Sequence, residues 1–162
     1  MSFNPYSGSV IPLFDHFVSV GNVNTSETDL YSDDIAANTL VDNGDKLEFM
    51  YAGILDGAHV NKSISIYFGG DLLFALPNQT LENMEWQISG TIIKSSPSEY
   101  KYTIEYHSND SSGLSGTSAG TTSSGSGINF AEENILKLTG ISAGSSDEVV
   151  AKLGFVKFVS HA

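Results

Sequence analysis

The sequence predicts an all-β fold, an antiparallel β-sandwich or barrel, and three observations lead to this prediction. Apolar and polar side chains alternate in short segments, as they do in strands that bury one face. Turn-forming pairs such as Asn43-Gly44 and Asp56-Gly57 separate these segments. Ser, Thr, Asn and Gly supply most of the polarity, whereas strong helix formers are scattered. The 162 residues are sufficient for one domain with a full core.

Eight or nine strands are expected from this alternation. They are expected at residues 16–20, 30–37, 47–51, 62–68, 72–76, 85–93, 98–107, 135–141 and 149–159. The first strand ends at Gly21-Asn22. The turn at residues 42–45 precedes the third strand, in which Leu47, Phe49 and Tyr51 share one face. Such short, evenly spaced strands are typical of antiparallel sandwiches and barrels.

The later strands follow the same period of two. In residues 62–68, Ile64, Ile66 and Phe68 are expected to point inward. The clearest alternation lies in residues 98–107, where Tyr100, Tyr102, Ile104 and Tyr106 share one face. Residues 111–127 consist almost entirely of Ser, Gly and Thr, and we expect a flexible, low-complexity loop there.

Residues 1–15 lack a regular period and combine prolines with apolar side chains. Two interpretations compete: a lead-in that folds over its own domain, and an extended arm that grips a neighbouring subunit. We divide the chain into an arm at residues 1–15 and a sandwich domain at residues 16–162. The residues expected to make the arm's contacts are Phe3, Pro5, Tyr6, Ile11, Pro12 and Phe14.

The charge balance argues against two classes of partner. The formal net charge is -12, from 19 acidic and 7 basic residues, and it repels nucleic-acid phosphates and anionic membrane surfaces. The sequence has no cysteine, so a disulfide framework and a thiolate metal site are excluded. The first residues show no signal-peptide pattern, and no apolar stretch has the roughly 20 residues of a membrane helix.

No catalytic, cofactor-binding or metal-ligating constellation is expected. The histidines are far apart along the chain: His16, His59, His107 and His161. Asp33-Asp34 and Asp42/Asp45 could offer oxygen ligands to calcium, but solvated turns are the favoured interpretation. The acidic pairs Glu82/Glu85, Glu132/Glu133 and Asp147/Glu148 fall in turns or at strand ends. Residues 116–120 approach a nucleophile elbow without its strand–turn–helix context.

Several apolar or aromatic side chains fall on positions expected to face outward, including Met50, Tyr67, Val156 and Phe158. A second buried surface between subunits would cover them. The tyrosine stripe of residues 100–106 could belong to the core, to such an interface or to a sugar-stacking surface. The expected subunit interface is Tyr67, Tyr100, Tyr102, Tyr106 and Phe158.

Five segments occur in an order that resembles a known family. They are Val20-Gly21-Asn22-Val23, Ile35-Ala36-Ala37-Asn38-Thr39-Leu40, Asn43-Gly44-Asp45, Ser65-Ile66-Tyr67-Phe68-Gly69-Gly70 and Trp86-Gln87-Ile88-Ser89-Gly90-Thr91-Ile92-Ile93. The pattern is similar to small jelly-roll domains of phage tail-fibre ends and of phage head-fibre or decoration proteins. The resemblance covers residues 16 to about 108, and Ala36 stands where the pattern has proline.

The resemblance implies a tumour-necrosis-factor-like jelly roll that assembles as a homotrimer on the virion exterior, after synthesis in the host cytoplasm. It leads us to expect a non-enzymatic decoration (cement) or head-fibre protein that contacts the major capsid protein and stabilises the shell. The alternatives are a receptor-binding tail-fibre tip, which would contact a host surface glycan, and a soluble glycan-binding module. No cofactor is expected.

Overall fold

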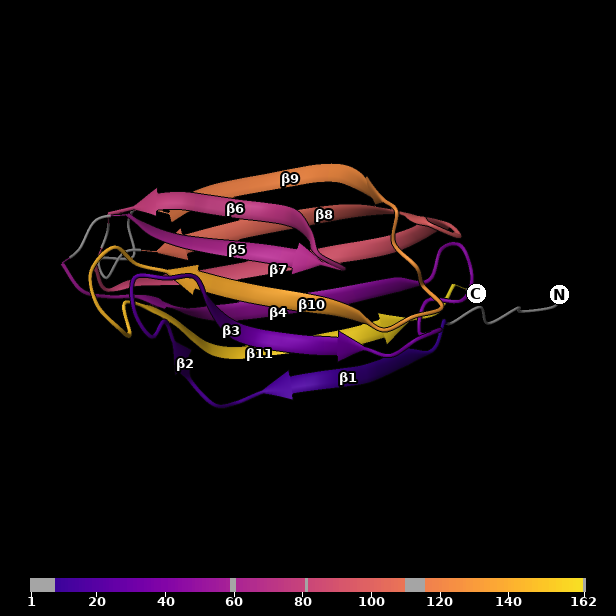
Figure 1. Cartoon of the computed structure of the whole chain (residues 1–162), viewed down its shortest axis with the longest axis horizontal. Coiled ribbons are helices and arrows are strands. Elements are labelled where there is room, and N and C mark those ends of the chain that lie inside the picture. Colours follow the sequence, from indigo (N-terminus) through magenta and orange to yellow (C-terminus); the bar gives the residue numbers. More distant parts are fainter. Residues whose placement is uncertain (1–7, 59–60, 81, 110–115, 162) are drawn as a thin grey trace, which may run out of the picture.

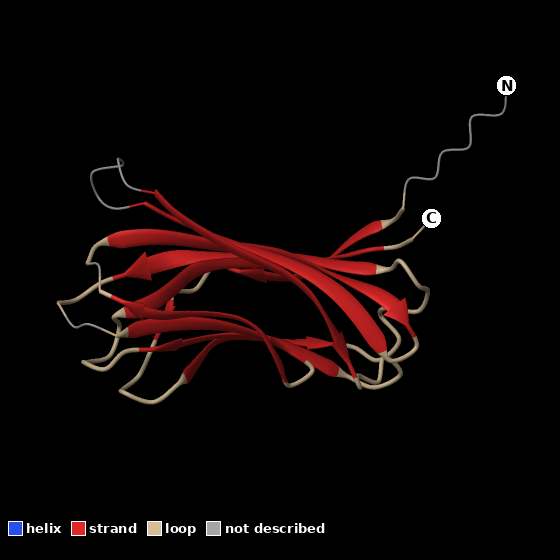
Figure 2. Cartoon of the chain, turned by 90° about the horizontal axis from the view of Figure 1, so that it is seen from above, coloured by secondary structure: helices blue, strands red, loops and turns tan. Residues whose placement is uncertain are grey.

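Alternating apolar side chains build two sheets that face each other, as the computed structural model shows (Figure 1, Figure 2). The structure describes residues 8–58, 61–80, 82–109 and 116–161, and the regular elements among them are all strands. Neighbouring strands pair antiparallel in both sheets. The predicted all-β antiparallel sandwich is therefore confirmed. Within the described ranges, no helix is long and apolar enough to cross a membrane.

The large sheet has seven strands and the small sheet has four. The large sheet contains β1 (Val10–His16), β2 (Val20–Gly21), β4 (Lys46–Leu55), β7 (Met84–Ser96), β8 (Glu99–Asn109), β9 (Gly116–Ser126) and β11 (Val149–Val159). The small sheet contains β3 (Thr28–Ile35), β5 (Lys62–Phe68), β6 (Asp71–Gln79) and β10 (Asn134–Ile141).

The strand order is that of a jelly roll with one added hairpin. The large sheet runs β1-β11-β4-β7-β8-β9, with β2 also on β11, and the small sheet runs β3-β10-β5-β6. If β1 and β2 are counted as one strand and β8 and β9 are left out, eight strands remain. Numbered 1 to 8 along the chain, they run in the order 1-8-3-6 across the large sheet and 2-7-4-5 across the small sheet. This interleaving is the double Greek key of a jelly roll. The β8–β9 hairpin widens the large sheet beyond β7 (Figure 1).

The core lies between the two sheets and is formed by the inward faces that alternation predicts. Phe49 and Tyr51 of β4 and Ile64 and Ile66 of β5 are buried, so the shared face predicted in β4 and the inward assignment in β5 are confirmed. Burial of large apolar side chains on both layers is the main stabilising contribution to such a sandwich. Val156 was expected to face outward and is instead buried, because its face of β11 points into the core.

The boundary of the predicted N-terminal arm is wrong. Residues 10–15 belong to the sandwich as part of β1, which pairs with β11 from Val10 to His16. Leu13 and Phe14 are drawn to the core and pack against it, which holds the strand in the sheet. The predicted strand at residues 16–20 is interrupted, because the chain leaves the sheet after His16 and returns only at β2. The expected contacts Phe3, Pro5 and Tyr6 lie outside the described residues.

The predicted loop at residues 111–127 is also wrong over most of its length. Gly116–Ser126 forms β9, which pairs with β8 from Asn109↔Gly116 to Glu99↔Ser126. An edge strand has one paired side, so small hydroxyl-bearing residues with little to bury can form it, and threonine suits a pleated strand. The strand also fits closely at Gly125, because a Cβ there would lie 2.1 Å from Cζ of Tyr100.

Candidate functional site

The outer face of the large sheet, which points away from the core, carries a hollow of about 530 Å³. The strand registers bring its lining together across β11, β4, β7 and β8. One cross-strand row holds Phe155, Met50, Ser89 and Glu105, and the next holds Lys157, Glu48, Thr91 and Thr103. Ser89 lies between the longer Met50 and Glu105 in the first row, and the second row ends in Thr91 and Thr103 beside Glu48. These short side chains leave the depression between their longer neighbours.

A second hollow of about 340 Å³ adjoins the first on the same face. Gln87 lines both, so the two form one surface, which we call the outer-face groove. The second hollow lies where the pairing of β11 with β4 shifts between Ala151 and Leu153, because this irregularity opens the sheet surface. Trp86, the single tryptophan of the sequence, also lines this hollow.

The polar side chains at the centre of the groove are available to a ligand. They are Gln87, Ser89, Thr91 and Thr103, and none of them makes a side-chain hydrogen bond within the described part of the chain. An amide and three hydroxyls can each donate and accept hydrogen bonds. The groove thus offers a concentrated set of neutral hydrogen-bonding groups.

One wall of the groove carries an ion-pair network. Glu48 lies 2.8 Å from Nζ of Lys157 and 3.3 Å from Nζ of Lys46. The hydrogen bond from Lys157, followed by that from Lys46, lowers the pKa of Glu48 despite the opposing effect of partial burial. Nζ of Lys157 also lies 5.9 Å from the centre of the Phe155 ring. These contacts fix the wall and neutralise much of its charge.

The outer face of the small sheet differs, because its polar side chains bind one another. The Glu27 carboxylate accepts hydrogen bonds from the hydroxyls of Tyr67, at 3.0 Å, and Thr139, at 2.5 Å. Lys137 pairs with Asp29 at 3.1 Å and lies over the Tyr67 ring. This face has a hollow of about 340 Å³, but much of its polar lining is already engaged.

The β1 margin of the large sheet is apolar and exposed. The exposed apolar side chains near it are Val10 and Ile11 at the start of β1, Phe17 and Val18 just after its end, and Val23 after β2. Phe17 is 83% exposed and Val18 is 74% exposed. The five residues form two groups at the two ends of β1, and exposed apolar side chains beside an unpaired strand edge are typical of protein-interaction surfaces. We call these five residues the apolar edge.

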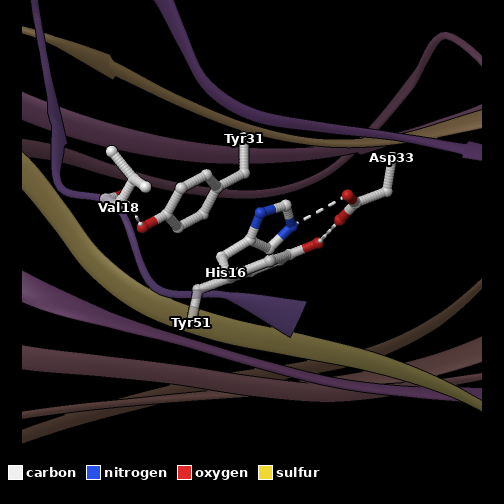
Figure 3. A network of polar contacts seen from close by, with 5 residues as sticks. All are labelled: His16, Val18, Tyr31, Asp33 and Tyr51. Carbon is white, nitrogen blue, oxygen red and sulfur yellow. Dashed lines mark hydrogen bonds and ion pairs between the residues drawn. The ribbon is translucent and has the colours of Figure 1, made fainter. Parts of the chain in front are cut away.

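A polar cluster holds the end of β1 against the rest of the sandwich (Figure 3). Nε2 of His16 lies 2.8 Å from one oxygen of Asp33, and the hydroxyl of Tyr51 donates to the other oxygen at 2.8 Å. The ring of Tyr31 stacks on His16, and its hydroxyl donates to the Val18 carbonyl. The cluster joins β1, the loop after it, β3 and β4.

The chemistry of this cluster indicates a clamp. Its carboxylate is buried, and its five residues include no serine, threonine or cysteine that could act as a nucleophile. Burial, followed by the charge of Asp33, raises the pKa of both Tyr31 and Tyr51. Both tyrosines therefore remain protonated donors at neutral pH.

The structure also bears on the calcium alternative. The Asp45 carboxylate accepts hydrogen bonds from the backbone N–H groups of Val41, Asp42 and His161. Both of its oxygens thus stabilise the turn and the C-terminal segment. In the described ranges, no group of three or more His, Asp or Glu side chains is arranged to hold a metal ion.

The predicted subunit-interface residues separate into two groups. Tyr100 and Tyr106 are fully buried in the core, so their assignment to an interface is wrong. Their face of β8 points at the small sheet, where the Tyr100 hydroxyl donates to Asp71 of β6 at 3.0 Å. Tyr102 and Phe158 are partly buried against the core.

The remaining predicted contacts lie at the surface, in different places. Tyr67 lies on the outer face of the small sheet. Ile11 and Pro12 are exposed on β1, whereas Phe14 is half-buried. The five predicted interface residues therefore do not form one surface.

Sequence reasoning missed both the outer-face groove and the apolar edge as surfaces. The groove had a readable signal, because Ser89 and Thr91 occupy the outward positions of a strand whose inward positions are Trp and Ile. The missing information was the register, which places these residues beside Thr103 and Glu105 of β8. The exposed pair Phe17-Val18 was hidden within a segment that was expected to be a strand.

No known protein-family model matches the chain, and no curated protein matches it. Among solved structures, the chain is similar to the CBM2 module of the evolved Dit of Lactobacillus casei BL23 phage J-1, with 8% identity and a TM-score of 0.44 over 96% of this chain and 99% of that one. Dimeric latent PorU from Porphyromonas gingivalis matches with 15% identity and a TM-score of 0.31, over 94% of this chain and 14% of that one. The infectious bursal disease virus Gx strain structure matches with 14% identity and a TM-score of 0.29, over 93% of this chain and 39% of that one. At these identities and TM-scores the matches assign the chain to no family.

Proposed function

We propose that the chain is a virion structural protein, a homotrimeric decoration (cement) or head-fibre protein on the outer surface of a tailed-bacteriophage capsid. In this role it has no catalytic activity and stabilises the shell. The observation that carries the proposal is the apolar edge, where half of the exposed large apolar side chains of the described residues gather. The jelly-roll topology and the motif resemblance support the choice of a phage virion.

The apolar edge is suited to contact with other proteins. Removing apolar surface from water contributes roughly 25 cal/mol per Å². Phe17 and Val18 protrude from the end of a clamped strand, so they can contact a partner without unfolding their own domain. β1 pairs with β11 on one side only, and its other side carries backbone groups that a neighbouring subunit can meet.

Charge and mass action fit the same role. A net charge of -12 opposes binding to packaged DNA and favours an exterior position. A protein that binds the assembled shell more tightly than its separated subunits stabilises the shell by mass action. Apolar edges that join three copies give the particle three contacts with the shell, and multivalent attachment strengthens binding without new types of contact.

The test is binding to expanded, DNA-free capsids of the phage whose genome encodes the chain. The wild-type chain should co-sediment with these capsids and raise their melting temperature. The double substitution Phe17→Asp/Val18→Asp should weaken co-sedimentation at least about tenfold, because it places charge on the apolar edge.

The matched control is Thr122→Asp/Ser123→Asp on β9, the opposite edge of the same sheet, which should leave co-sedimentation unchanged. Failure of the wild-type chain to bind would contradict the proposal. Equal binding by the Phe17→Asp/Val18→Asp variant would show that another surface makes the contact.

A further inference from the structure

We infer that the outer-face groove is a binding site for an extended, neutral polysaccharide chain. The inference is independent of the proposed role in the virion, because the groove lies on the face of the large sheet and the apolar edge lies at its margin. Its two hollows, of about 530 and 340 Å³, each fall in the range of roughly 300–1,000 Å³ that is typical of ligand sites.

The hydrogen-bonding groups of the groove match a polyhydroxylated ligand. A sugar hydroxyl both donates and accepts, and so do the side chains at the groove centre, Gln87, Ser89, Thr91 and Thr103. These groups make no side-chain hydrogen bond within the described residues, so a ligand would not have to displace an internal partner. The corresponding face of the small sheet lacks this property, since Glu27 and Lys137 already engage the polar groups around them.

Apolar side chains stand beside these polar groups. Phe155 and Met50 form part of the first hollow, and Leu153 contributes to the second. The C–H faces of a sugar ring pack against aromatic and aliphatic surface while its hydroxyls bond at the ring edge. A protein segment would instead require deep apolar anchors, and the centre of the groove offers hydroxyls in their place.

Charge selects a neutral polysaccharide over an anionic one. The lining includes Glu48, Glu85 and Glu105, and the whole chain carries a net charge of -12. Lys157 lines the first hollow but is already paired with Glu48 at 2.8 Å. Burying an additional carboxylate or sulfate beside these groups would be unfavourable.

The continuity of the groove points to a chain of several sugars. Gln87 lines both hollows, so one ligand can occupy both while contacting its amide. Trp86 lies in the lining of the second hollow and is the only tryptophan of the sequence. Its side chain is 2% exposed and belongs to the core face of β7, so it offers no stacking surface to the ligand.

The experiment is native affinity electrophoresis of the full chain through gels that contain laminarin, dextran or galactomannan, with hyaluronan as the anionic probe. At least one neutral polysaccharide should retard the chain, and hyaluronan should not. Ser89→Tyr, which fills the groove, and Phe155→Ala, which removes its ring, should each weaken retardation at least about tenfold. Ser32→Tyr, the same change as the first variant but on the outer face of the small sheet, should retain wild-type retardation.

Three results would overturn the inference: no retardation by any neutral probe, equal retardation by hyaluronan, or full retention by both groove variants. Gln87→Ala provides a further variant that only removes atoms, so the test stands even if Ser89→Tyr fails to fold. Light scattering of the same variants separates this result from assembly, because the groove variants should keep the wild-type particle mass.

Discussion

β1 and β9 lie at the two edges of the large sheet (Figure 1), and they are built from opposite kinds of residues. At one margin, β1 and the loop after it expose Val10, Ile11, Phe17 and Val18. At the other margin, β9 consists of Gly, Ser, Thr and one Ala. Both strands leave one side unpaired in the single chain. Of these two margins, as far as the structure describes them, only the β1 margin exposes large apolar side chains.

This difference separates an edge that water solvates from an edge that favours association. Unpaired strand edges promote association, and proteins protect them with polar side chains, irregularities or a partner. The β9 edge uses small hydroxyl side chains that water can solvate. β1 has proline and a register shift after Pro12, but its apolar side chains remain exposed, and the proposed assembly would cover them.

Each edge is nevertheless held firmly to the sandwich by a tyrosine-containing contact. At the β1 edge, Asp33 links His16 to Tyr51. At the β9 edge, the Tyr100 ring lies against Gly125 while its hydroxyl bonds to Asp71 of the small sheet. These anchors allow the two edges to be tested separately.

The largest effect is expected from Asp33→Ala. The substitution removes a buried carboxylate and leaves the hydroxyl of Tyr51 without its acceptor, so it should lower the free energy of unfolding by about 3 kcal/mol. Urea unfolding measures this loss. Asp34→Ala, the neighbouring and exposed carboxylate of β3, is the control and should change stability by less than about 0.5 kcal/mol. Equal losses for the two variants would show that the clamp does not hold β1.

Gly125→Ala should destabilise the β9 edge by about 1–3 kcal/mol. The new Cβ would collide with the Tyr100 ring, which is fully buried and tethered to Asp71, so the ring cannot swing away freely. Gly120→Ala on the same strand should cost less, because its Cβ would meet the Ile104 carbonyl oxygen at 3.2 Å. Hydrogen exchange of β9 amides together with urea unfolding checks both. A neutral Gly125→Ala would mean that β9 is not seated as described.

High pH should weaken both anchors. Burial, followed by nearby acidic groups, raises the pKa of Tyr51 and Tyr100 above 10. The unfolded state loses these protons near pH 10 while the folded state retains them, so stability is constant below about pH 10 and falls above it. The slope should reach up to about 1.4 kcal/mol per pH unit for each such tyrosine. Urea unfolding between pH 8 and 11.5 measures this slope, and unchanged stability over that range would contradict it.

The smallest effect is expected from Thr122→Ala on the exposed edge of β9. Its side chain is exposed and lies at a strand margin, so the free energy of unfolding should change by less than about 0.5 kcal/mol. The particle mass should also remain that of the wild type in light scattering. A change of mass would show that the β9 edge takes part in assembly.

The two edges are also where sequence reasoning failed, whereas the inner strands followed it. Ile64, Ile66 and Phe68 alternate strictly because β5 has a paired strand on each side and a buried face. β1 is interrupted by Pro12, and β9 lacks large side chains, so neither shows the period from which a strand is predicted. Tyr100 and Tyr106 were correctly placed on one face, but alternation alone does not say whether that face meets the core or another subunit. The groove required the register between strands, which is a long-range property.

Light scattering coupled to gel filtration measures whether sister copies cover the apolar edge in solution. We predict a particle of about three times 17.3 kDa for the wild-type chain at micromolar concentration, and a particle near 17.3 kDa for Phe17→Asp/Val18→Asp. A wild-type chain that elutes as a stable monomer would contradict the account, because it would show that the exposed side chains of Phe17 and Val18 need no partner.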